Sequence, residues 1–326
     1  MTTSTTATTD TGLLSGIRQS GVRGDRAFRS VAVLGGLAVL LILGLIAIST
    51  TREAWPAFQA EGFGFVFSDN WNPAAGEFGA AAFVFGTLLV SGIAIVLAVP
   101  VSVGVALFMT EVAPKRLRVV MSAVMDLLAT IPSVVYGLWG VLVFAPWIAD
   151  RYATIESATE GIPVVSALLT GNQSGRSFMT AGIILAVMIT PIIAAVTREV
   201  FETVPRSQKD AALALGATRW EMIRGAVFPH SRNGTVAATM IGLGRAMGET
   251  IAIALVIGSS PKISAELFGS GDTMAAVIVN NFGEATDTFR AALIGLGVVL
   301  FVITILIGIL ARGVAYRMER RAAGGM

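Results

Sequence analysis

The chain has 326 residues, of which 54% are hydrophobic and only 13% are charged. The charged share is about half of the roughly 25% that soluble domains contain, and the apolar blocks are longer than a globular core requires. The sequence therefore predicts one integral membrane domain. It has no Cys and a single His, which excludes a disulfide, a cysteine nucleophile and a histidine metal cluster. No Lys stands in a Gly-Lys-Ser/Thr pattern, so the chain lacks a phosphate-binding loop for ATP.

The first twelve residues are rich in Thr and nearly uncharged, so we expect them to be disordered. Four Arg residues then precede an apolar block over residues 31–48, and no small-residue cleavage site follows that block. We therefore expect a cytoplasmic tail over residues 1–29 and a retained first transmembrane helix over residues 30–50.

Five further apolar blocks each reach the roughly 20 residues that a helix needs to cross a hydrocarbon layer of about 30 Å. The fold expected is all-α, with six transmembrane helices, a core of five of them over residues 79–312 and a cytoplasmic tail over residues 313–326. The five blocks are Gly79–Met109, Val119–Ile148, Phe178–Val200, Val236–Gly258 and Ala291–Leu310.

The distribution of Lys and Arg predicts the orientation, because positive residues in short loops stay in the cytoplasm. The two terminal segments, the loop around Lys115 and the loop from Arg198 to Arg232 contain 17 of the 23 Lys and Arg residues. The alternate loops contain five, and the last one, Arg245, lies inside the fifth of the six apolar blocks, Val236–Gly258. We expect both termini on the cytoplasmic side of the inner or plasma membrane, and no nucleic-acid partner.

Prolines interrupt three of the blocks, at Pro100, Pro132 and Pro191. Such helices are expected to be kinked, and Pro132 is a candidate hinge, although a proline in a membrane helix is usually only a bend. Tyr136 either lines the pathway or is a packing aromatic. Asp126 is either a gate residue or a helix-end acid that pairs with a base of the inner loop.

The loop from Val204 to Pro229 is the most informative inner segment. Ser207 and Thr218 are each followed three residues later by an acid, which is a capping pattern at a helix start. Gly216 suits the left-handed conformation that ends a helix, and Pro229 is expected to stop the second helix. The loop therefore predicts two short cytoplasmic helices that are bent at Gly216.

This loop resembles the coupling motif of ABC importer permeases of type 1, whose general form is E-A-A-x3-G-x9-I-x-L-P. The spacing fits throughout, with Asp in place of Glu at the start and two changes before the final proline. The matching positions are Asp210, Ala211, Ala212, Gly216 and Pro229. The resemblance implies that coupling helices over residues 205–228 lie in a groove of an ATPase subunit and pass its closure to the membrane helices. The bases expected to form ion pairs at its rim are Arg206, Lys209, Arg219 and Arg224.

The second constellation is the run GLGRAMGETIA, which begins at Gly242. Arg245 lies about nine residues into its predicted helix, so at 1.5 Å per residue it is about 14 Å deep. Placing Arg at that depth costs on the order of 3 kcal/mol, so it should face a cavity or a partner. Glu249 lies one helical turn further on, on the same face. The two side chains either form a structural salt bridge or bind a substrate.

A guanidinium is a natural ligand for a tetrahedral oxyanion, because it donates two parallel hydrogen bonds. A carboxylate beside it accepts a hydrogen bond from a protonated oxyanion such as HPO4 and repels a fully ionised one such as sulfate. Arg245 with Glu249 therefore favours phosphate as the substrate, with the structural salt bridge still open.

The same run is similar to the signature of phosphate-specific ABC permeases, and other stretches resemble the PstC-type subunits of that family. These stretches are Trp71-Asn-Pro73 with Phe78-Gly-Ala80, residues 131–137 and residues 273–285. The resemblance covers about residues 25–318, and its last stretch separates this type from the sister PstA type. It implies a type I ABC importer permease fold, phosphate translocation at Arg245 and Glu249, and the function of a permease subunit in an ATP-driven importer of inorganic phosphate.

The resemblance also implies a heterodimer with a sister permease of the PstA type. The other implied partners are two copies of an ATPase of the PstB type, an extracytoplasmic phosphate-binding protein of the PstS type, phosphate and membrane lipid. We expect no metal or cofactor in this chain, and ATP with Mg²⁺ on the partner ATPase, so the chain itself is not an enzyme. The alternatives are a permease for sulfate, molybdate or phosphonate, and a transporter that needs no ATPase.

Overall fold

The structure is a computed structural model that describes residues 11–159, 161–171 and 174–323. Side chains are described from Gly24 to Gly313, except at residues 160, 163, 172 and 173. The chain divides into two compact units, Met1–Arg52 and Glu53–Met326. Of the expected disordered segment, residues 1–10 lie outside the described residues, and a helix begins at Thr11.

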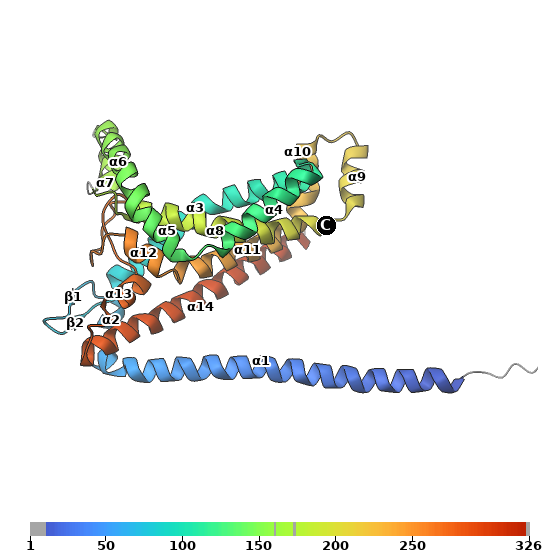
Figure 1. Cartoon of the computed structure of the whole chain (residues 1–326), viewed down its shortest axis with the longest axis horizontal. Coiled ribbons are helices and arrows are strands. Elements are labelled where there is room, and N and C mark those ends of the chain that lie inside the picture. The colour runs from blue at the N-terminus through green and yellow to red at the C-terminus, as the bar shows by residue number, and fades with distance from the viewer. Residues whose placement is uncertain (1–10, 160, 172–173, 324–326) are drawn as a thin grey trace, which may run out of the picture. The chain divides into compact units, whose positions relative to one another are not determined.

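Helices make up most of both units (Figure 1). The long helices are α1 (Thr11–Glu61), α3 (Ala81–Leu107), α4 (Lys115–Thr130), α6 (Ala145–Thr159), α8 (Phe178–Glu202), α11 (Phe228–Met247) and α14 (Asp287–Ala323). The short helices are α2 (Gly64–Phe67), α5 (Ser133–Trp139), α7 (Pro163–Leu169), α9 (Arg206–Ala214), α10 (Arg219–Met222), α12 (Ile251–Val256) and α13 (Met274–Asn281). Three π-helical segments continue helices, namely η1 (Phe108–Val112), η2 (Gly140–Phe144) and η3 (Ile223–Val227).

Two short strands form the hairpin that precedes α3. Strand β1 (Trp71–Asn72) pairs antiparallel with β2 (Glu77–Phe78), so that Trp71 lies opposite Phe78. The Trp71 ring packs edge-on against Phe78 and Phe83, and Phe78 is buried in the cluster that also contains Leu293 and Leu296 of α14. The hairpin therefore closes one end of the second unit.

Five helical stretches of the described residues are long and apolar enough to cross a membrane. They are Gly24–Glu61, Ala81–Val112, Ser133–Thr159, Phe178–Glu202 and Asp287–Gly313. The apolar side chains of the first stretch, such as Leu40 and Leu41, are exposed within their unit, as a helix facing lipid requires. The total of six spans stays a prediction, because the block Val236–Gly258 is not among these five stretches.

That block is not a single helix, which corrects the expected span. α11 ends at Met247, and α12 begins only at Ile251. Gly248 caps α11, and the Glu249 side chain bonds to the backbone of the next helix instead of continuing its own. Glycine favours a break and an acid near a helix start competes for backbone N–H groups, so the interruption follows from these residue types.

The expected span Val119–Ile148 is wrong in the same way. α4 ends at Thr130 and α5 begins after Pro132, with Ile131 and Pro132 both extended. A proline disfavours helical backbone in the residue before it, which explains the break. Pro100 and Pro191, in contrast, lie inside the continuous helices α3 and α8.

The main core lies where α3 runs beside α8, with α11 against α8 (Figure 1). Its buried residues include Val90 and Ala94 of α3 and Ile189 of α8. The Ser102 hydroxyl donates to the Thr190 carbonyl at 3.0 Å, which joins the same two helices through a polar contact. This pair of helices forms the frame against which the candidate site is positioned.

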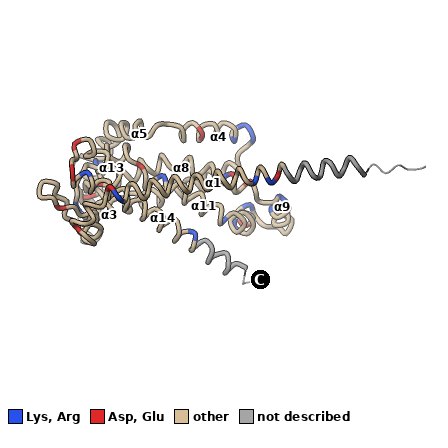
Figure 2. The backbone as a smooth tube through the Cα atoms, turned by 90° about the horizontal axis from the view of Figure 1, so that it is seen from below, with Lys and Arg blue, Asp and Glu red and all other residues tan. Residues whose placement is uncertain are grey.

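Basic segments gather at one end of the second unit. Figure 2 shows Lys and Arg along the start of α4, along α9 and near the end of α14. A separate apolar cluster lies at this end, and it contains Ala106, Phe201, Val204, Met222, Ile223 and Val227. We call it the α9-end cluster, because α9 and α10 are attached to the helical core through it.

Candidate functional site

Arg245 lies in the last turn of α11, two residues before that helix ends. Its side chain is exposed in the isolated chain, and no ion pair joins it to Glu249 within the described residues. The structural salt bridge that the spacing left open is therefore not formed.

Glu249 has the opposite environment, because it is only 8% exposed. Its Oε1 accepts a hydrogen bond from the Ala252 backbone N–H at 3.4 Å, in the first turn of α12. The positive end of a helix stabilises a carboxylate at this position. The helix break thus lies between an exposed Arg245 and a buried Glu249.

Tyr136 is the third predicted residue that the fold brings to this place. α5 packs against α12, and a side-chain carbon at Gly137 would come within 2.8 Å of the Ala252 Cα, so only glycine allows this approach. The positive charge of Arg245 acts electrostatically on the Tyr136 hydroxyl. Tyr136 is also half-buried and packs against the main core.

The other two candidate gate residues lie on or beside α4. Pro132 is exposed and forms the N-cap of α5. Asp126 is exposed on α4, and no ion pair links it to a base anywhere in the described part of the chain. The predicted pairing of Asp126 with an inner-loop base is therefore not formed among the described residues.

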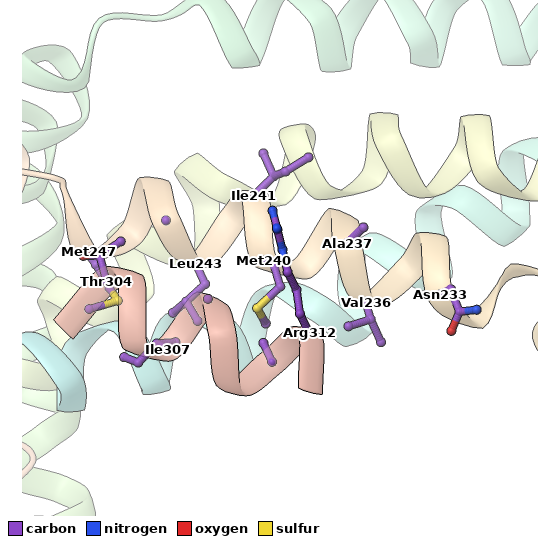
Figure 3. Close-up of a pocket in the computed structure, with 13 residues that line it drawn as sticks. Asn233, Val236, Ala237, Met240, Ile241, Leu243, Met247, Thr304, Ile307 and Arg312 are labelled. Carbon is purple, nitrogen blue, oxygen red and sulfur yellow. The ribbon is translucent and has the colours of Figure 1, made fainter. Parts of the chain in front are cut away.

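A cavity of about 630 Å³ lies between α11 and α14 (Figure 3). Its walls are mostly apolar, and the Arg312 side chain of α14 extends across it toward α11. The cavity is lined by Asn233, Val236, Ala237, Met240, Ile241, Leu243, Gly244, Met247, Thr304, Ile307, Gly308, Ala311 and Arg312. Neither Arg245 nor Glu249 lines it, so this cavity alone is not the predicted anion site.

The expected pair of short helices is present in the loop before α11. α9 and α10 are separated by Gly216, whose φ of +85° is in the left-handed region. Thr218 and Glu221 form a reciprocal capping box at the start of α10, and its hydrogen bonds lower the pKa of the Glu221 carboxyl. The first helix differs from expectation, because Pro205 is its N-cap and Ser207 caps nothing.

The motif residues of this pair divide between two faces. Asp210 and Ala211 are exposed, whereas Ala212 is half-buried and packs against the α9-end cluster. Three large apolar side chains that were not predicted as functional are also exposed here: Leu213, Leu215 at 90% and Trp220 at 60%. Apolar residues on a polar inner loop were the signal that could have identified them.

Pro229 does not stop a helix, which corrects the prediction. The backbone stays helical from α10 through η3 into α11, and Pro229 lies in the first turn of α11. The preceding π-helical segment pairs the Phe228 N–H with the Ile223 carbonyl, five residues back. The hydrogen-bond pattern changes from π-helical to α-helical at this point. Proline is therefore tolerated despite its missing N–H, as it is in the first turn of any helix.

The comparisons with known proteins identify the family. The model of the family described as "Binding-protein-dependent transport system inner membrane component" matches residues 98–324, which include α9, α10 and α11. The chain belongs to this family. This transport permease is 41% identical over 299 residues to the phosphate transport system permease protein PstC of Mesorhizobium japonicum, over 91% of each chain. It is 39% identical over 320 residues to PstC of Xylella fastidiosa (strain Temecula1), over 98% of this chain and 99% of that one.

The permease therefore falls within the PstC group of the family. Its fold resembles a bacterial alginate ABC transporter in complex with an alginate pentasaccharide-bound periplasmic protein, with a TM-score of 0.56 at 16% identity. That likeness covers 92% of this chain and 97% of the other. It is a multi-pass membrane protein with the type I ABC permease fold, as the sequence predicted.

Proposed function

We propose that this permease imports inorganic phosphate as one of two membrane-spanning subunits of an ATP-driven transporter. The observation that carries the proposal is Arg245, exposed and without an ion-pair partner in the described part of the chain, at the end of an interrupted helix. The names of its PstC relatives support phosphate as the substrate.

In this proposal Arg245 binds the oxyanion through its guanidinium. The isolated chain leaves this side chain on an open surface, so a second permease is needed to enclose it. We assign that role to a sister subunit of the PstA type, with the pathway between the two chains. A guanidinium in such a low-dielectric pathway binds an anion more strongly than it does in water.

We assign to Glu249 the recognition of the protonated oxyanion, HPO4. The Ala252 N–H fixes one carboxylate oxygen, and within the described residues no hydrogen bond to a side chain or backbone engages the other. A free carboxylate oxygen accepts a hydrogen bond from the P–OH of HPO4, whereas sulfate carries no such proton at neutral pH. Arg245 thus supplies attraction, and Glu249 supplies selectivity.

Coupling to ATP is assigned to the helix pair α9 and α10. Asp210, Ala211 and the exposed Leu215 and Trp220 form the surface that we propose docks on an ATPase of the PstB type, with Ala212 and Gly216 shaping the pair. Two copies of that ATPase bind ATP and Mg²⁺, and this chain performs no bond chemistry. An extracytoplasmic protein of the PstS type delivers phosphate at the opposite end.

Closure of the ATPase pair would open the pathway outward, and hydrolysis would return it to the inward orientation. We assign the hinge between these orientations to the break at Pro132, with Tyr136 on one side of it and Asp126 on the other. The basic end that contains α9 is proposed to be cytoplasmic. The distribution of Lys and Arg along the sequence also leads us to propose that both chain termini are cytoplasmic.

A permease for sulfate, molybdate or phosphonate is the rival function, and uptake measurements separate them. Cells that lack only this chain are given radiolabelled phosphate or radiolabelled sulfate at low external concentration. The proposal predicts loss of the phosphate component alone, restored by the wild-type chain. Persistent phosphate uptake with loss of sulfate uptake would overturn the substrate assignment and leave the fold unaffected.

A further inference from the structure

The helix α9 is held to the rest of the permease by two of its nine side chains. Only Lys209 and Ala212 are half-buried, and the other seven are exposed. They lie three residues apart, so they share one face of the helix. Ala212 packs on the α9-end cluster, and Lys209 makes the polar contact of this face.

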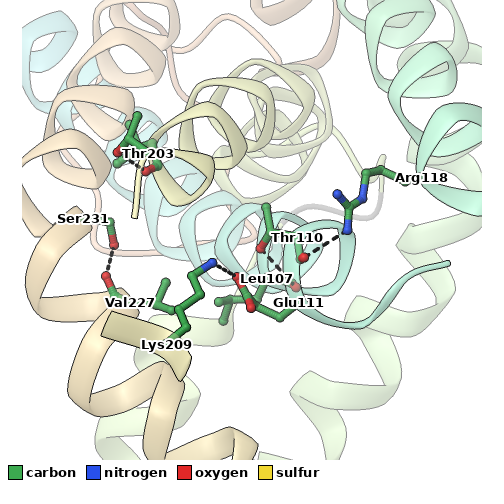
Figure 4. A network of polar contacts seen from close by, with 9 residues as sticks. Leu107, Thr110, Glu111, Arg118, Thr203, Lys209, Val227 and Ser231 are labelled. Carbon is green, nitrogen blue, oxygen red and sulfur yellow. Dashed lines mark hydrogen bonds and ion pairs between the residues drawn. The ribbon is translucent and has the colours of Figure 1, made fainter. Parts of the chain in front are cut away.

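The partner of Lys209 is Glu111, 98 residues earlier in the chain. The Lys209 Nζ donates to the Glu111 Oε1 at 2.6 Å, and the two side chains are only 17% and 10% exposed (Figure 4). It is the one ion pair found among the described residues. Lys209 was expected at a rim that faces the ATPase, and its contact with Glu111 corrects that expectation.

Glu111 lies in η1, which continues the membrane-spanning helix α3. The neighbouring Thr110 carbonyl accepts a hydrogen bond from Arg118 of α4 at 3.0 Å (Figure 4). α3 in turn runs beside α8 through the main core. Lys209 is therefore linked to the junction of α3 and α4 through two polar contacts, which the adjacent residues Glu111 and Thr110 make.

The two contacts of α9 differ in what they can transmit. Apolar packing through Ala212 is non-directional, so it permits sliding along the cluster. A charge-assisted hydrogen bond has a preferred distance and angle, so it fixes the position of one element along another. The ion pair is mostly shielded from solvent, which limits its screening by salt.

We propose that Lys209 and Glu111 form a strut that transmits the movement of the coupling helices to α3. The proposal rests on the proposed function, because it presumes that α9 moves with an ATPase. Both are positioning residues and neither contacts the substrate. Breaking the pair should lower the phosphate imported per ATP hydrolysed, while the ATPase can still dock on the exposed face of α9.

The test is a charge swap in the complete transporter, reconstituted in proteoliposomes with its sister permease, ATPase and binding protein. Lys209→Glu and Glu111→Lys should each lower the phosphate imported per ATP by about tenfold, and the double swap should restore it to within about threefold of wild type. A mismatched swap is the control. Lys209→Glu with Glu202→Lys has the same net charge but puts the new Lys at an exposed position at the end of α8, so it should not restore import.

Equal import per ATP in all variants, or equal rescue by both swaps, would overturn the strut. If a reversed charge prevents assembly, the neutral variants Lys209→Met and Glu111→Gln replace it. Each should then uncouple import from hydrolysis, and unchanged coupling in both would overturn the proposal. A wild-type transporter that imports no phosphate with ATP would instead contradict the proposed function.

Discussion

The Tyr136 hydroxyl donates a hydrogen bond to the Leu128 carbonyl, with 3.0 Å between the two oxygens. Leu128 lies in the last turn of α4, and Tyr136 lies in α5 beyond the break at Pro132. The bond therefore spans the break and satisfies a carbonyl that has no partner in its own helix once proline ends it. It fixes the angle between two helices whose backbone connection is extended.

Tyr136→Phe keeps the ring in its half-buried position and removes only this bond. An unsatisfied carbonyl loosens the break, so we expect the initial rate of phosphate import to fall by about two- to fivefold, in line with the roughly 1 kcal/mol that one hydrogen bond contributes. The initial rate of phosphate import should fall further in Tyr136→Leu, which also lacks the aromatic ring. Unchanged import in both variants would show that the break needs no such restraint.

Gly216 has a φ of +85°, and a side-chain carbon placed there would meet no atom within 4 Å. The cost of substitution is therefore conformational and not steric. Asn tolerates left-handed backbone better than a β-branched residue does. Gly216→Asn should therefore retain most ATP-dependent phosphate import, whereas Gly216→Val should lower that import about tenfold. Import and ATP hydrolysis are measured on the same proteoliposomes. Equal import in the two variants would contradict the role of the left-handed bend.

Glu249→Gln preserves shape and one carbonyl oxygen for the Ala252 N–H, but it replaces the acceptor that we assign to the protonated oxyanion with a donor. We expect the ratio of phosphate to sulfate uptake to fall by about tenfold, equivalent to about 1.4 kcal/mol. Glu249→Asp, which keeps the charge, should preserve the ratio. An unchanged ratio in the Gln variant would remove Glu249 from substrate recognition.

Asp272 gives a pH-dependent prediction outside the spans. It is buried beside Gly86 of α3, and burial raises the pKa of its carboxyl to about 7, against the opposing effect of hydrogen bonds from the Thr273 N–H and Ser259. The Asp272 carboxyl therefore keeps its proton up to about pH 7 in the native state, whereas it loses that proton near pH 4 in the unfolded state. Stability therefore falls between about pH 4 and pH 7 and stays lower above that range.

The check is the thermal midpoint of the purified permease in detergent at pH 6 and pH 8, with Asp272→Asn as the comparison. The Asn variant has no such ionisation, so the wild type should lose about 4 °C more than the variant over this interval, as a difference of 1 to 2 kcal/mol would give. Thr273 N–H can still donate to the Asn carbonyl. Parallel behaviour of the two proteins would contradict the raised pKa.

Local patterns predicted the parts of this protein that local chemistry determines. Long apolar blocks identified the spans that α1, α3, α8 and α14 form, and Gly216 with the Thr218 capping pattern identified a bent helix pair, because hydrophobic length and left-handed backbone are properties of neighbouring residues. The same reasoning failed where two signals compete. Pro229 was expected to stop a helix, yet the helix continues through it, because the hydrogen-bond register changes in η3 just before the proline.

Tertiary contacts explain the rest of the differences. Arg245 and Glu249 are four residues apart in sequence, but the helix breaks between them, after Met247, and one side chain is exposed while the other is buried. A block that is apolar on all sides has no periodicity from which this break could be predicted. Lys209 was assigned to a partner surface because its contact with Glu111 joins residues 98 positions apart. Such a pair is visible only when α3 and the helix pair are folded together.

The central claim is that Arg245 is the anion ligand of the pathway. The most direct measurement is ATP-dependent import of radiolabelled phosphate by the complete transporter in proteoliposomes, with wild type, Arg245→Ala and Arg232→Ala compared. Arg232 is an exposed Arg near the other end of the same helix, so it controls for charge and helix. We predict that Arg245→Ala loses at least about a hundredfold of import, as loss of a charged ligand gives, while Arg232→Ala stays near wild type. Import by Arg245→Ala at the wild-type rate would contradict the account.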